Sequence, residues 1–333
     1  MSIIATIKEV AAMAGVSMTT VSRVLNFDEG LNVSPDTKKK IFEVAEKLKY
    51  VSGKQKRAKE KYFNIGIVNW YTEGDEIRDP YFLSIRMAVE GKCNEENINF
   101  TYINFNRDKQ YKDIDGIVAI GKFGQEEIQN IKRISDKIVF IDSSPNELEY
   151  DSVVIDYEGG VTRALNHLYD EGHRNIGFIG GEEYVSNGKE KIIDQREKTY
   201  EKFMESINNL RGSNIYLGEF LPEHGYKLMK KAIEEKEIPT AFFIASDPMA
   251  IGAYRAALES GYKIPEDISI IGFDDIYTSQ FLTPALTTVK VYTDFMGKVA
   301  VETLIGRLKC GSEVCRKIVI PTKLIVREST KKL

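Results

Sequence analysis

Apolar residues recur at helical spacing in three short segments of the first 50 residues. The first segment begins with Thr6-Ile7-Lys8-Glu9, in which the Thr hydroxyl and the Glu carboxylate can each bind an unpaired backbone N–H of a helix start. It ends at Gly15, which tolerates the left-handed backbone of a helix C-terminus. Ser17 is a suitable N-cap for a second helix over 18–25, and Ser34 for a third. The pattern predicts three small helices around one core, with a very short turn between the first two.

Residues 51–61 interrupt this periodicity, since they contain five Lys or Arg and one apolar residue other than alanine. Such a segment cannot contribute to a core, so we interpret it as a linker. Beyond it, short apolar runs alternate with amphipathic segments, which is typical of parallel sheets with helices on both faces. The runs are 65–70, 100–105, 116–120, 138–141, 176–179, 241–245 and 268–272. The later intervening segments predicted to be helical are 189–209, 223–236 and 248–260.

There are more apolar runs than one small sheet holds, which favours two lobes. We therefore predict a small all-α head at 1–50, a linker at 51–62 and, at 63–333, an α/β core of two doubly wound parallel-sheet lobes.

The composition, with 42% hydrophobic and 29% charged residues, is that of a soluble globular protein, and no apolar run approaches the roughly 18 residues that span a membrane. Lys8 and Glu9 interrupt the apolar start where a signal peptide would need a continuous apolar stretch, so we expect a cytoplasmic protein. Three scattered cysteines, Cys93, Cys310 and Cys315, form neither a disulfide framework nor a metal site with the three histidines. We expect reduced thiols, no metal and no cofactor.

The net charge of −4 is unevenly distributed. Residues 1–61 hold 12 Lys or Arg against 7 Asp or Glu, which leaves 34 against 43 for the rest of the chain. A basic head with an acidic body indicates a polyanionic partner such as nucleic acid, although a solvated charged surface is an equally good reading of charge alone.

Residues 6–26 fit a helix-turn-helix, in which the second helix presents its outer face to the DNA major groove. An ordinary helical hairpin is the alternative. If the apolar stripe of this helix faces inward, its outward residues are Met18, Thr19, Thr20, Ser22 and Arg23. The Arg23 guanidinium suits guanine or phosphate, and Met18 suits a thymine methyl group.

The chain resembles the lactose/galactose-repressor family of bacterial transcriptional regulators over essentially its whole length. The resemblance is carried in the head by Thr6 to Ala11, Ala14 to Ser17, Thr20 to Asn26 and Val33 to Thr37, and in the body by Asp79 to Phe82, Gly172 to Arg174, Ile176 to Gly181, Ala245 to Asp247, Ile268 to Asp275 and Pro284 to Val289. Within the family, Leu31-Asn32-Val33 and Asp79-Pro80-Tyr81 are most similar to repressors of galactoside-utilisation operons.

The resemblance implies a helix-turn-helix head that binds double-stranded operator DNA, a hinge, and a two-lobed core that dimerises and binds a small effector between its lobes. It adds Thr6, Ser17 and Asn26 to the expected DNA contacts. In the hinge, the family's minor-groove leucine falls on Ala58 or Lys59, so we expect Lys56 and Arg57 to contact phosphates instead. We expect a homodimer rather than a tetramer, because no heptad helix follows Val326.

Acidic and hydroxyl residues follow several of the apolar runs, where parallel sheets bind ligands. Asp142, Ser246 and Asp274 are of this kind, and carboxylates suit sugar hydroxyls. The resemblance adds the effector contact Arg196, with Asp142 and Asp274 at acidic contact positions. For each, a structural role such as helix capping is the alternative. Aromatic residues expected to border the effector, with core packing as the alternative, are Trp70, Tyr81 and Phe220. Val291 replaces a glutamine contact that the family pattern predicts.

We therefore expect a sequence-specific DNA-binding regulator, a repressor of galactoside-utilisation genes that a small sugar releases or tunes. A non-galactoside effector or a co-repressor is the alternative within this class. A solute-binding protein would share the body but predicts a signal peptide and no basic head. We do not expect an enzyme, because no nucleophile–base motif, phosphate loop or paired metal spacing surrounds His167, His173 or His224.

Overall fold

The computed structural model describes residues 6–25, 31, 33–48, 50, 63–105, 111–186, 188–235, 237–311 and 313–333. The chain divides into two units, Met1–Tyr62 and Phe63–Leu333, which we call the head and the core. The linker predicted at 51–62, with its expected contacts Lys56 and Arg57, lies outside the described residues, as does Asn26.

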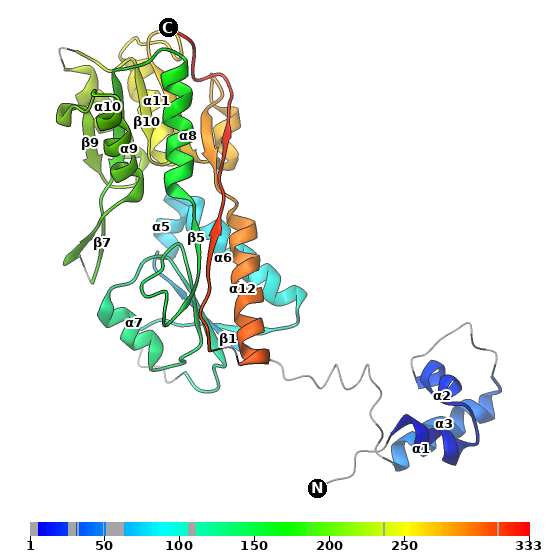
Figure 1. Ribbon diagram of the computed structural model, residues 1–333. Coiled ribbons are helices and arrows are strands. Elements are labelled where there is room, and N and C mark those ends of the chain that lie inside the picture. Colours follow the sequence, from blue (N-terminus) through cyan, green and yellow to red (C-terminus); the bar gives the residue numbers. More distant parts are fainter. Residues whose placement is uncertain are drawn as a thin grey trace. The chain divides into compact units, whose positions relative to one another are not determined.

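The described residues of the head form three helices, α1 (Ile7–Ala14), α2 (Met18–Leu25) and α3 (Pro35–Lys47) (Figure 1). The predicted start of α1 is confirmed, because the Glu9 N–H donates to the Thr6 hydroxyl at 3.4 Å and the Thr6 N–H donates to the Glu9 carboxylate at 2.6 Å. Gly15 ends this helix with a φ of 71°, in the left-handed region. The buried side chains of this small core are Val10, Ala11, Ala14, Val21, Val24, Ile41 and Ala45.

The first lobe of the core is a six-stranded parallel sheet in the order β13-β5-β4-β3-β1-β2. Its strands are β1 (Asn64–Asn69), β2 (Asn99–Tyr102), β3 (Gly116–Ile120), β4 (Ile138–Ile141), β5 (Asp151–Ile155) and β13 (Lys317–Ile320). The helices of this lobe are α5 (Glu73–Arg78), α6 (Pro80–Glu95), α7 (Gln125–Lys132) and α12 (Thr293–Cys310). Helices α6 and α12 pack together on one side of the sheet, and α7 lies on the other (Figure 1).

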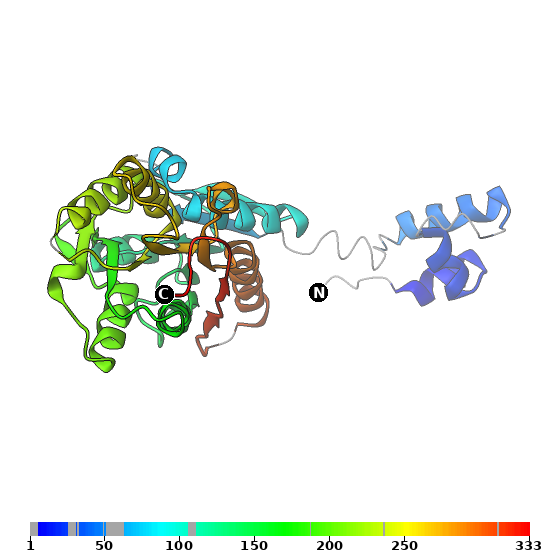
Figure 2. The same ribbon diagram turned by 90° about the horizontal axis from the view of Figure 1, so that it is seen from above.

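The second lobe has a six-stranded sheet in the order β14-β12-β11-β10-β6-β9, in which only β14 is antiparallel. Its strands are β6 (Ile176–Gly181), β9 (Ile215–Gly218), β10 (Ala241–Ile244), β11 (Ser269–Asp274), β12 (Thr287–Lys290) and β14 (Lys323–Ile325). Its helices are α8 (Tyr157–Asp170), α9 (Gln195–Ser206), α10 (Pro222–Ile233) and α11 (Asp247–Glu259). Viewed from above, α8 and α9 lie on one side of this lobe and α10 and α11 on the other (Figure 2).

The expected fold of two doubly wound lobes is confirmed, with two local differences. The run 100–105 is a strand only as far as Tyr102. The segment 189–209 is helical only from Gln195, because its first residues belong to a hairpin of β7 (Glu183–Val185) and β8 (Glu190–Ile192). Positive φ values at Ser186 (56°) and Gly188 (80°) reverse the chain between the two strands. The sequence did not predict this hairpin, because the segment is rich in charged residues with helical propensity.

The chain passes between the lobes three times, after β5, after β12 and between β13 and β14. None of the helices in the described part of the chain is long and apolar enough to cross a membrane. The three crossings bring the carboxyl ends of strands from both sheets to one cleft between the lobes.

Candidate functional site

A cleft between the two lobes collects the residues that follow the carboxyl ends of their strands. Its cavity measures about 20 Å³, enough for roughly one water. The lining residues from the first lobe are Asp79, Tyr81, Phe82, Lys122 and Asp142, and those from the second are Tyr157, Glu183, Arg196, Phe220, Ser246 and Asp274. Six of the seven residues expected from the sequence therefore lie together, all except Trp70.

Trp70 packs behind the cleft lining instead of forming it. Its ring lies 5.2 Å from Tyr71 and 5.7 Å from Phe82, centroid to centroid. Gly121 has a φ of 108°, and a Cβ there would be 2.4 Å from the Trp70 Cβ. Trp70 is half-buried, packs against these neighbours and does not line the present cavity, so its expected effector contact stays a prediction.

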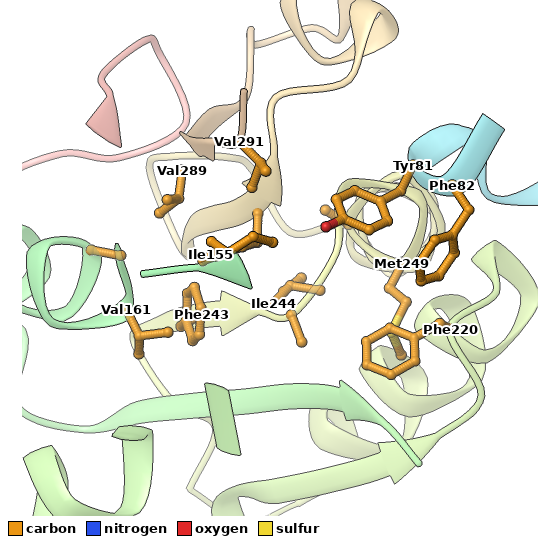
Figure 3. Packing of buried hydrophobic residues seen from close by; sticks show 14 of the residues in the cluster. Tyr81, Phe82, Ile155, Val161, Phe220, Phe243, Ile244, Met249, Val289 and Val291 are labelled. Atoms are coloured by element: carbon orange, nitrogen blue, oxygen red, sulfur yellow. The ribbon is translucent and has the colours of Figure 1, made fainter. Parts of the chain in front are cut away.

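Aromatic side chains of the two lobes face each other at the cleft. Tyr81 and Phe82, at the start of α6, lie opposite Phe220 and Met249 of the second lobe (Figure 3). The guanidinium carbon of Arg196 lies 4.6 Å from the centroid of the Phe220 ring. These rings supply apolar surface beside the charged groups, which is the combination that sugar rings need.

Arg196 is held by a buried carboxylate that the sequence reading missed. Its Nη2 and Nε donate to the two oxygens of Asp194 at 2.7 and 3.0 Å, and its Nη1 donates to the Ala245 carbonyl at 2.8 Å. Burial opposes ionisation of Asp194, but Arg196 holds the pKa of that carboxyl below its ordinary value. Asp194 is also the N-cap of α9, so the start of this helix fixes the guanidinium. The only sequence signal was an Asp two residues before an Arg at a helix start.

Asp142 accepts hydrogen bonds from two tyrosines, of which Tyr157 connects it to the second lobe. Its Oδ1 accepts the hydroxyl of Tyr81, from the first lobe, at 3.1 Å and that of Tyr157, from the second, at 2.7 Å. Asp142 has a φ of 69°, an unfavourable backbone that aims its carboxylate into the cleft from the end of β4. Tyr157 was missed because it follows β5, a strand that our pattern analysis did not recognise.

Two further carboxylates line the cleft, Asp79 and Asp274, and neither forms an ion pair within the described residues. Asp79 caps α6, where it accepts the Tyr81 N–H at 3.2 Å. Burial, helped by the neighbouring Glu183 and Asp142, raises the pKa of Asp79 to about 6, although the Tyr81 N–H and the Arg196 guanidinium oppose the change. Burial also raises the pKa of Asp274, together with the charges of Asp247 and Asp79. The cleft is therefore rich in carboxyl groups, and two of them, Asp79 and Asp274, ionise less readily than ordinary aspartates.

Ser246 and its neighbour Asp247 have structural partners. The Ser246 hydroxyl accepts the Met249 N–H at 3.4 Å, which caps α11, and the residue also lines the cleft. Asp247 is fully buried and accepts the hydroxyls of Ser279 and Thr288 at 2.6 and 2.7 Å. Asp247 thus links α11 to β12 by a hydrogen bond, whereas Ser246 both caps α11 and lines the cleft.

In the head, α2 presents Met18, Thr19 and Arg23 at its exposed surface. Ser17 accepts the Thr20 N–H at 3.1 Å, and the two hydroxyls are 2.8 Å apart. Thr6 caps α1, and Ser22 is half-buried. Among the expected DNA contacts, Thr6, Ser17 and Thr20 therefore also stabilise the helix starts.

A helix-turn-helix head on a core of two lobes with a polar cleft defines a ligand-responsive DNA-binding protein. Residues 6–52 match the model of the bacterial regulatory proteins of the lacI family, and residues 165–330 match that of a periplasmic binding protein-like domain. The chain belongs to the LacI family and is a DNA-binding transcriptional regulator.

Similar proteins match over almost the whole chain. The HTH-type transcriptional repressor MelR of Bacillus subtilis (strain 168) is 37% identical over 97% of this chain and 96% of its own. The HTH-type transcriptional regulator GalR of Lacticaseibacillus casei is 34% identical over 98% of this chain and 99% of its own. Among solved structures, the CelR–cellobiose complex covers 98% of this chain and 99% of its own with a TM-score of 0.69 and 24% identity, which shows the shared fold.

Proposed function

We propose that this regulator represses sugar-utilisation genes, galactoside genes in particular, and that a sugar bound in the cleft releases or tunes it. The observation that carries the proposal is the convergence of Asp142, Arg196 and Asp274 at the cleft, from strand and helix ends of both lobes. Carboxylates and a guanidinium held by charge-assisted bonds suit hydroxyl groups, and the nearby rings suit the apolar face of a sugar.

The DNA-binding part of the proposal rests on α2. Its exposed Arg23 and Met18 can reach base edges in a major groove, while the capped helix starts keep the small head rigid. The expected hinge contacts, Lys56 and Arg57, and the expected contact Asn26 remain part of the proposal, and all three residues lie outside the described ones.

A sugar needs more room than the present cavity, so binding requires the lobes to separate and close again around the ligand. The Tyr157–Asp142 hydrogen bond connects the two lobes, so a ligand that replaces this bond changes the balance between lobe arrangements. A sugar with different affinity for the two arrangements would thereby alter DNA binding.

The regulator is proposed to act as a homodimer, since a single small head covers only one half-site. Exposed apolar side chains mark a suitable surface on the first lobe. A groove of about 500 Å³ between α6 and α12 is lined in part by Leu83 and Met87, and Met87 is 61% exposed. A second copy of the chain would cover this surface.

The test is binding of the purified full-length protein to fluorescently labelled duplex DNA from its own promoter region, with and without sugars. We expect tight binding to that DNA, weaker binding to random duplex, and a change of at least about tenfold with one sugar. In Asp274→Asn the sugar response should weaken by about one to two orders of magnitude while DNA binding persists. The matched control is Asp136→Asn, an exposed aspartate that lines neither the cleft nor the α6–α12 groove. DNA binding that no sugar alters would contradict the proposal.

A further inference from the structure

The β7–β8 hairpin of the second lobe reaches the first lobe. It follows β6 directly and extends toward α7 (Figure 1). At its turn, Ser186 lies against Gly124, the residue before α7. A Cβ added at Gly124 would be 2.1 Å from the Ser186 hydroxyl oxygen and 3.2 Å from its backbone nitrogen. The hairpin therefore approaches Gly124 so closely that any side chain at this position would collide with Ser186.

This position of the hairpin brings Glu183 to Lys122, on the loop after β3. The two side chains form an ion pair, and the Lys122 Nζ also lies 3.9 Å from Oδ2 of Asp142. Burial alone would lower the pKa of Lys122, but the Glu183 and Asp142 carboxylates raise it above its usual value, so the ammonium stays charged. A charged, buried ammonium is what an anionic ligand would bind, and here Glu183 occupies it.

The other cation of the cleft is also engaged. Arg196 is paired with Asp194 through two oxygens, as described above. Four lining carboxylates, those of Asp79, Asp142, Glu183 and Asp274, face these two paired cations. A ligand with a phosphate or carboxylate would bring negative charge next to these carboxyl groups, whereas hydroxyl groups would donate hydrogen bonds to them.

We propose that Glu183 is a specificity-determining residue, which occupies Lys122 and so makes the cleft select uncharged sugars over phosphorylated or acidic ones. This inference rests on the proposed function, because it takes the effector to be a sugar in this cleft. In this proposal the hairpin, through Glu183, determines whether the cleft binds an uncharged or an anionic sugar.

The experiment is calorimetry of the full-length protein with matched sugars that differ only in charge. The probes are galactose, galactose 6-phosphate and galacturonate, together with glucose, glucose 6-phosphate and glucuronate. We expect the uncharged form to bind at least about tenfold more tightly than its anionic forms. In Glu183→Gln this ratio should fall by about tenfold or more, because Lys122 becomes available to the anion.

Glu182→Gln is the matched control. It removes the same charge from the preceding residue, which pairs with Lys191 at 2.5 Å and does not line the cleft, so the ratio should stay unchanged. The double variant Lys122→Gln/Glu183→Gln should again exclude anions, since it removes the ammonium as well. If Glu183→Gln does not fold, Glu183→Asp, which keeps the charge but draws it away from Lys122, should show a smaller loss of the same discrimination.

The outcomes separate the two proposals. Equal or tighter binding of the anionic sugars to the unaltered protein, or an unchanged ratio in the Glu183 variants, would overturn the role of Glu183 and leave a sugar effector standing. Absence of binding for every sugar tested would overturn the sugar effector, and the role of Glu183 with it.

Discussion

The outer face of α2 and the cleft between the lobes are built in opposite ways. The proposed DNA contacts on α2 lie within one eight-residue helix, and Met18, Thr19 and Arg23 among them are exposed to solvent. The cleft collects eleven side chains between residues 79 and 274, six of them charged. The first surface depends on a local fold, and the second on charges that the two lobes bring together. Substitutions should therefore separate the two functions.

The single tryptophan of the chain allows the stability of the core to be measured separately from DNA binding by the head. Trp70 lies in the core and the head contains none, so tryptophan fluorescence follows unfolding of the core alone. DNA binding, in turn, requires a folded head.

Asp194→Asn should destabilise the core strongly while sparing the head. It leaves the buried Arg196 guanidinium without its charged partner, which typically costs about 3 to 5 kcal/mol. Urea unfolding followed by Trp70 fluorescence measures the loss. Asp136→Asn, which breaks an exposed pair with Lys137, should cost less than about 1 kcal/mol. Equal effects of the two variants would show that the buried pair does not hold the cleft together.

Ile41→Ala should have the converse effect. Ile41 is fully buried in a head core of seven residues, and loss of its side chain should cost about 2 to 5 kcal/mol. We expect DNA binding to fail while the Trp70 unfolding transition stays in place. Glu43→Ala, an exposed change on the same helix, serves as the control. A shift of the Trp70 transition in Ile41→Ala would mean that head and core do not unfold separately.

Asp79 should make the stability of the core depend on pH. The pKa of Asp79 is raised to about 6 in the folded protein, so the native state binds more protons than the unfolded chain between about pH 4 and 6. The free energy of unfolding should therefore fall as pH rises through this window, by up to about 3 kcal/mol from this group. The Asp79→Asn variant keeps a good N-cap residue and should lack this component. Parallel pH profiles of the two proteins would refute the prediction.

Arg23→Ala should weaken binding to the specific DNA by about 1 to 3 kcal/mol and binding to random duplex by much less. The reason is that a guanidinium that reads a base edge adds affinity only at the right sequence. Fluorescence anisotropy with both duplexes measures the difference, and Arg255→Ala, an exposed arginine on α11 of the core, is the control. Equal losses on both duplexes would make Arg23 a phosphate contact.

The difference between the two regions also explains what the sequence could predict. The helix ends in the head follow from contacts between near neighbours, Thr6 with Glu9 and Ser34 with Thr37. The central strands were recognisable because they are buried on both faces and continuously apolar, as in β3. The candidate cleft residues found in advance were those that follow such strands, or that matched a family position.

The residues that were missed depend on contacts between distant parts of the chain. Lys122 and Glu183 are 61 residues apart, and no local pattern marks either as part of a cleft. The second strand of the hairpin that carries Glu183 lies in the charged segment 189–209, which the sequence predicted to be helical. Trp70 was expected at the cleft from the family resemblance, whereas its packing beside Phe82 depends on the left-handed Gly121, 51 residues away in the chain.

The passage from β13 to β14 has a consequence for how the core unfolds. Two residues separate these strands, and each is an edge strand of a different sheet: β13 pairs with β5 in the first lobe, and β14 with β12 in the second. If this segment detaches, both sheets lose an edge strand in the same event. The two lobes should therefore denature in a single cooperative transition rather than one after the other.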